Sequence, residues 1–113
     1  MLIYNVTIHV DASVHEDWLK WMQERHIPDV LATGKFTRAL MTRVLVKEDL
    51  GGPTYSVQFS CASRESLERY YAEDAEGLRE ESHRLFGNHL GSFRTELQVI
   101  REIVANTQNL HNG

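Results

Sequence analysis

The sequence predicts an α+β fold in which the elements follow the order βαββαβ. Runs of alternating apolar and polar residues mark strands near both ends of the chain and in its middle, and two segments with apolar residues at helical spacing separate them. Right-handed crossovers then give a four-stranded antiparallel sheet with two helices on one face, the ferredoxin-like arrangement. The length of 113 residues fits one domain. We assign that domain to residues 1–104, followed by a polar tail over residues 105–113.

The first half of the pattern begins with a strand over residues 2–10, in which every second residue is apolar. Ser13 and Glu16 have the spacing of a capping box and predict that a helix begins there. Pro28 is expected to end or kink this helix. Residues 36–46 are rich in apolar and β-branched types and predict the second strand.

The second half repeats the order after a turn at Gly51–Gly52. Residues 55–61 alternate and predict the third strand, and Ser63 predicts the N-cap of a helix that ends near Gly87. Residues 91–103 predict the last strand. The inward stripe of the second helix is expected to consist of Leu67, Tyr71, Leu78 and Leu85.

The sheet face away from the helices, the bare face, is expected to be polar but uncharged in its middle. Charge is expected only on its flanking strand, at Arg94 and Glu96. A fully solvated face usually carries more Lys, Glu and Arg, so this composition favours a face covered by a second copy of the chain across a small wet cavity. An ordinary solvated face is the alternative. The central side chains of the bare face are Asn5, Thr7, His9, Ser56, Gln58 and Ser60.

Composition narrows the classes of partner and cofactor. The net charge is −4 and the 12 basic residues are scattered, which argues against binding nucleic acid or an anionic membrane. A single cysteine, Cys61, leaves no internal disulfide and no thiolate-rich metal site, and we expect it to be a buried apolar residue. The six histidines show no metal-ligand spacing, and there is no Gly-rich phosphate loop, so we expect neither metal nor cofactor. With no signal peptide or spanning segment, the sequence predicts a soluble cytoplasmic protein.

Two histidines are candidates for chemistry. His9 projects onto the bare face and His26 lies where a helix gives way to a loop, so either imidazole could act as a general acid or base. A structural histidine bonded to backbone is the alternative for each. Trp18 could form an aromatic wall and Arg94 could hold a carboxylate, although core packing and surface ion pairing are the ordinary roles of these residues. The complete candidate ligand set is Asn5, Thr7, Trp18, Gln58, Ser60 and Arg94.

Several motifs resemble a family of short bacterial proteins, common in Bacteroidetes-type bacteria, that is described as a domain of unknown function. They are Tyr4-Asn-Val-Thr7, Trp18-x-x-Trp21-Met22, the run His26-Ile-Pro-Asp-Val-Leu-Ala-Thr-Gly34, the Gly-Gly turn, Tyr55-x-Val-Gln-Phe59 and Phe93-Arg-Thr95. The resemblance covers the chain to about residue 100. It implies similarity to dimeric α+β barrels, a group that includes cofactor-free monooxygenases, isomerases and haem-handling enzymes. The family has no agreed catalytic residues to transfer.

Three functions are therefore open. The first is a dimeric barrel that binds a small molecule in a polar cavity on the sheet face. The second is a cofactor-independent monooxygenase or isomerase of a small aromatic or carboxylated metabolite, with His9 or His26 as acid and base. The third is a structural or regulatory dimer that binds a protein partner. Fold alone does not decide among them.

Overall fold

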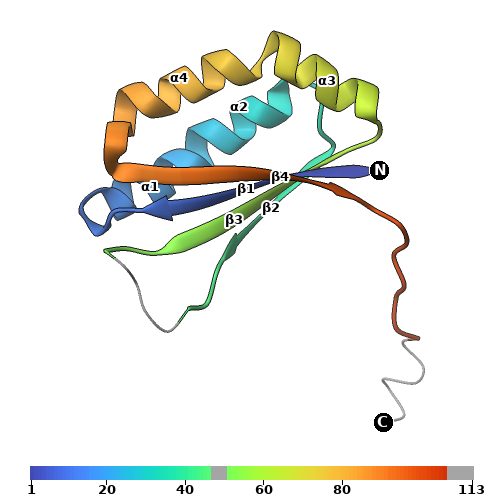
Figure 1. Cartoon of the computed structure of the whole chain (residues 1–113), viewed down its shortest axis with the longest axis horizontal. Coiled ribbons are helices and arrows are strands. Elements are labelled where there is room, and N and C mark those ends of the chain that lie inside the picture. The colour runs from blue at the N-terminus through green and yellow to red at the C-terminus, as the bar shows by residue number, and fades with distance from the viewer. Residues whose placement is uncertain (47–50, 107–113) are drawn as a thin grey trace.

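The computed structural model describes residues 1–46 and 51–106. It confirms the ferredoxin-like fold, since one antiparallel sheet with the strand order β2-β3-β1-β4 is covered on one face by helices (Figure 1). The strands are β1 (Leu2–Val10), β2 (Arg38–Arg43), β3 (Thr54–Cys61) and β4 (Leu90–Gln98). The helices are α1 (His15–Trp21), α2 (Ile27–Ala32), α3 (Arg64–Glu73) and α4 (Ala75–Phe86). Short 3-10 turns cover Ala12–Val14 and Gly87–His89, and no described helix has the length and apolar character needed to cross a bilayer.

The first helical layer, formed by α1 and α2, differs from its prediction at both ends. The capping box is wrong, because Ser13 lies in a 3-10 turn and makes no cap bond, and Val14 is the N-cap of α1. The helix also does not end at Pro28. A π-helical turn, Met22–His26, joins α1 to α2, and Pro28 occupies the first turn of α2, where its missing N–H costs no hydrogen bond.

The second helical layer, formed by α3 and α4, begins as predicted and then breaks. Ser63 caps α3 by accepting a hydrogen bond from the Ser66 N–H at 3.2 Å. Asp74, with φ −127° and ψ −35°, interrupts the helix and changes which residues of α4 face the sheet. Leu85 is therefore 44% exposed, contrary to its predicted inward position, and Phe86 is buried instead.

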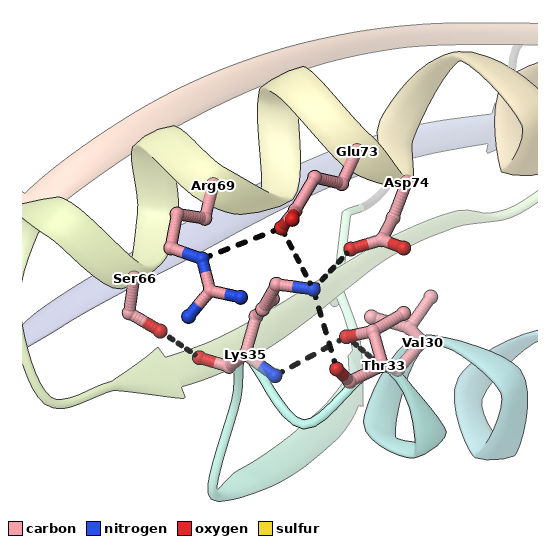
Figure 2. Close-up of polar contacts among 7 residues, drawn as sticks. All are labelled: Val30, Thr33, Lys35, Ser66, Arg69, Glu73 and Asp74. Atoms are coloured by element: carbon pink, nitrogen blue, oxygen red, sulfur yellow. Dashed lines mark hydrogen bonds and ion pairs between the residues drawn. The ribbon is translucent and has the colours of Figure 1, made fainter.

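A half-buried lysine holds this break against the first layer (Figure 2). The Lys35 amine contacts Asp74 Oδ2 at 2.9 Å and Glu73 Oε2 at 3.2 Å, and only 11% of its side chain is exposed. Ser66 Oγ donates to the Lys35 carbonyl at 2.7 Å. The loop between α2 and β2 is thereby bonded to both α3 and the α3–α4 break.

The last strand has the opposite orientation to the one predicted. Val6 pairs with Arg94 and Tyr4 with Glu96, and residues directly opposite in a ladder project to the same face. Arg94 and Glu96 therefore lie on the helix side, and the prediction that they charge the bare face is wrong. Phe93 lies on the bare face, opposite Thr7. The strand ends at Gln98 rather than at residue 103, and residues 99–106 leave the sheet as an extended segment (Figure 1).

The turn before β3 packs closely on the end of β1. Gly51 and Gly52 both have positive φ, as the turn prediction requires. Ala12 N–H donates to the Gly51 carbonyl at 2.8 Å, and Val10 N–H donates to the Pro53 carbonyl at 2.9 Å. A Cβ at Gly52 would overlap the Val10 carbonyl, so this position accepts only glycine without a backbone shift.

Candidate functional site

A cavity of about 200 Å³ lies between the sheet and the helical layer. Its inner wall is buried and largely apolar, because central strands β1 and β3 and the first helical layer all direct core side chains into it. An engineered apolar cavity of about 150 Å³ holds benzene, so this volume suits a molecule with one ring. The buried residues of the wall are Tyr4, Ile8, Trp18, Met22, Val57, Phe59 and Tyr70.

Part of the remaining lining is polar and exposed. Arg79 and His83 come from α4, and Ser92 and Arg94 come from β4, which is an edge strand of the sheet. The cavity therefore combines an apolar interior with a polar rim between α4 and β4. This is the usual composition of a small-molecule site, in which a few polar groups orient an otherwise apolar ligand.

His26 lines the cavity from the π-helical turn. Its ring stacks on Trp21, with centroids 4.7 Å apart and planes inclined by 28°. Its Nδ1 is buried and has no hydrogen-bond partner among the described residues. Burial lowers the pKa of His26, and the charge of Arg94 adds to this, while Glu81 and Asp29 oppose it. The imidazole is therefore neutral at pH 7 and able to exchange a proton.

Two tyrosines meet an arginine in the lining of the same cavity. Arg79 Nη2 donates to Tyr4 Oη at 3.2 Å, and the rings of Tyr4 and Tyr70 lie 5.6 Å apart. Burial raises the pKa of Tyr70 to about 12, and the nearby Tyr4 contributes to that shift. The phenol of Tyr70 is thus protonated near neutral pH and offers an O–H donor rather than a negative charge.

The structure divides the predicted site residues between the two faces of the sheet. Trp18, His26 and Arg94 line the cavity on the helix side. The other five candidates lie on the bare face, so the eight do not form one site. Those five are Asn5, Thr7, His9, Gln58 and Ser60.

On the bare face the polar side chains bond to one another. Ser56 Oγ donates to Asn5 Oδ1 at 2.6 Å, and Asn5 Nδ2 contacts Thr7 Oγ1 at 3.4 Å. His9 Nδ1 lies 3.1 Å from Thr54 Oγ1. These contacts give His9 a structural partner, whereas the Nδ1 of His26 has none within the described chain.

Sequence reasoning missed the contribution of the second helical layer, which is Tyr70, Leu78, Arg79, Ser82 and His83. A signal for these residues exists in retrospect, because Arg79, Ser82 and His83 recur at spacings of three and four on one side of α4. It was hidden by the break at Asp74, which displaces the apolar stripe on which the prediction relied.

A family model described as domain of unknown function (DUF4286) matches residues 1–100. The chain belongs to the DUF4286 family. No curated protein matches it.

Solved structures similar to this DUF4286 chain share its fold at low identity. A dimeric ferredoxin-like protein from an uncultured marine organism is 14% identical, with a TM-score of 0.66 over 90% of this chain and 96% of that one. The Arabidopsis thaliana protein At3g17210 is 12% identical, with a TM-score of 0.68 over 92% and 100%. SnoaB from Streptomyces nogalater, a cofactor-independent oxygenase, is 11% identical, with a TM-score of 0.62 over 90% and 95%.

Proposed function

We propose that this DUF4286 chain forms a homodimer and binds a small organic molecule in the cavity between its sheet and its helices. The observation that carries the proposal is the cavity itself, with buried aromatic walls, a polar rim and a buried imidazole nitrogen that has no partner in the described chain. A buried polar atom without a partner is costly, and a ligand supplies the missing hydrogen bond.

The bare face supports the homodimer. Correcting the orientation of β4 places apolar side chains there, since Phe93 is 63% exposed and Leu40 and Leu97 are also exposed. Leu40 lies on β2 and the other two lie on β4, so exposed apolar side chains flank the polar middle of the face on both edges of the sheet. Large exposed apolar side chains on one face are typical of a surface that another molecule covers. The similar marine protein is itself described as dimeric. We infer that the polar network of Asn5 and Thr7, together with His9, Gln58 and Ser60, lies within this interface.

Native mass spectrometry of the protein as purified from its own cells tests both parts. We expect the mass of a dimer carrying a small molecule, and a Ser82→Phe variant, which places a ring in the cavity, should lose that molecule. Leu85→Phe is the matched control on the exposed side of α4 and should retain it. A monomer would refute the homodimer. A dimer of bare mass would refute retention of a ligand and favour a structural or regulatory dimer that binds a protein.

A second candidate function is a cofactor-independent oxygenase or isomerase, which the state of His26 favours. A neutral, desolvated imidazole beside a ligand can remove a proton from it, the first step of an isomerisation or of an oxidation in which the substrate supplies the electrons. The similar protein SnoaB is described as a cofactor-independent oxygenase. Incubating the retained molecule with the protein in D₂O tests this. Deuterium should enter the molecule with the wild type and not with His26→Gln, and absence of exchange in both would leave binding alone.

We infer that the protein works in the cytoplasm, as the sequence predicts, and in a bacterium, as the family resemblance implies. Fractionation of the source cells, with the protein followed by antibody, would test it.

A further inference from the structure

The rim of the cavity carries positive charge without a compensating carboxylate. Arg79 and Arg94 both line the cavity, and no Asp or Glu is among the residues that line it. The two side chains come from different elements, α4 and β4. Their charge reaches the interior, because Arg94 contributes to the lowered pKa of His26 and both arginines oppose the rise in the pKa of Tyr70.

Neither arginine is neutralised within the described residues. The guanidinium of Arg79 donates to the phenol oxygen of Tyr4 rather than to a carboxylate, and Arg94 makes no hydrogen bond or ion pair there. Two arginines of α3, by contrast, are paired with carboxylates. Arg64 contacts Glu96 at 2.7 Å and Arg69 contacts Glu73 at 3.4 Å. The cavity rim is therefore a place where two cations face a shared space without an anion.

The interior of the cavity determines the apolar part of the ligand, as the rim determines its charged part. Trp18, Phe59 and Tyr70 are buried around a volume of about 200 Å³, which accommodates one ring but not a larger fused system. Buried apolar walls favour a ring, and guanidinium groups bind carboxylates with two parallel hydrogen bonds. We infer that the ligand is a single-ring carboxylic acid whose ring occupies the aromatic interior and whose carboxylate lies between Arg79 and Arg94. This inference rests on the proposed binding function and names the chemical class of its ligand.

Titration calorimetry with two matched probes tests it. Benzoate and benzamide have nearly the same size and shape, but only benzoate is charged, so the ratio of their dissociation constants isolates the contribution of the anion. We expect benzoate to bind at least about tenfold more tightly than benzamide, which corresponds to about 1.4 kcal/mol. Arg94→Gln should abolish that preference while leaving the binding of benzamide unchanged. Because Arg94 is exposed and unpaired in the described chain, this variant should fold normally, as circular dichroism would verify.

Arg84→Gln is the control for charge on the surface of α4, since Arg84 lies outside the lining of this cavity. It should keep the full preference for benzoate.

Equal binding of both probes would overturn the anion assignment and leave the binding function standing. A preference that survives in Arg94→Gln, or is lost in Arg84→Gln, would overturn the role of the rim. Displacement of benzoate by inorganic phosphate at equal concentration would overturn the requirement for a ring, and failure of both probes to bind would overturn the inferred ligand class. In that last case an unrelated molecule retained in native mass spectrometry would preserve the binding function, and its absence would remove that too.

Discussion

Phe93→Ser should weaken the proposed dimer strongly, because this ring is the most exposed aromatic group on the bare face. Phe93 is 63% exposed, so about 125 Å² of a side chain of about 200 Å² remains to be covered. At about 25 cal/mol per Å², covering it contributes about 3 kcal/mol per copy, and a twofold interface contains both copies. Truncating one side chain at an interface usually costs less binding free energy than the covered area of both copies would give, about 2–4 kcal/mol. We therefore expect the dissociation constant to rise by about 30-fold to about 1,000-fold.

Sedimentation velocity over a wide range of protein concentration measures this change. Leu85→Ser is the control, because Leu85 is also exposed and apolar but lies on α4, in the opposite layer. It should leave the dimer intact. Unchanged association of Phe93→Ser, with the wild type clearly dimeric, would refute the assignment of the bare face as the interface.

Three further predictions concern stability and reactivity. Because burial lowers the pKa of His26 below 6.5, the unfolded chain binds a proton that the folded chain does not as the pH falls below that value. The free energy of unfolding should consequently fall between pH 7 and pH 5 by more in the wild type than in His26→Gln, as urea titrations would show. Gly52→Ala should lower the free energy of unfolding by about 2–4 kcal/mol, since its Cβ would displace the Val10 carbonyl. Gly77→Ala, in open space on α4, should raise it by about 0.5–1 kcal/mol, and equal effects of the two substitutions in thermal melts would contradict the close packing at Gly52. Cys61 is buried and burial raises the pKa of its thiol, so a thiol reagent should modify it only when the chain unfolds; rapid reaction with the folded protein would be contrary to this.

The order of elements and the central strands could be predicted because their alternation is unambiguous. Tyr4 and Ile8 are both buried, as their period of two requires, and Tyr55 and Phe59 behave in the same way. Ser63 was recognisable because a cap residue acts within four residues of itself. Local chemistry was sufficient in each of these places.

The orientation of β4 was predicted wrongly because the strand inverts the usual amphipathic rule. Phe93 and Leu97 share one parity and Arg94 and Glu96 the other, yet the charged parity faces the helices. Its register with β1 decides the matter, and register is a non-local property. Arg94 lies on the side that an amphipathic pattern reserves for apolar residues, because a cavity rather than packed core occupies that place. Violations of pattern concentrate at functional sites, so the failed prediction and the candidate site coincide at this residue.

The π-helical turn Met22–His26 makes the site sensitive to chain length as well as to residue identity. Each residue of an α-helix advances the direction of the side chains by about 100°, and a π turn accommodates one additional residue without ending the helix. Deleting Gln23, which is exposed, would let the turn relax into an ordinary α-helix and rotate His26 relative to Trp18. Related chains that differ by a single insertion or deletion in this turn could therefore keep the same sheet and helices while presenting a different side chain to the ligand.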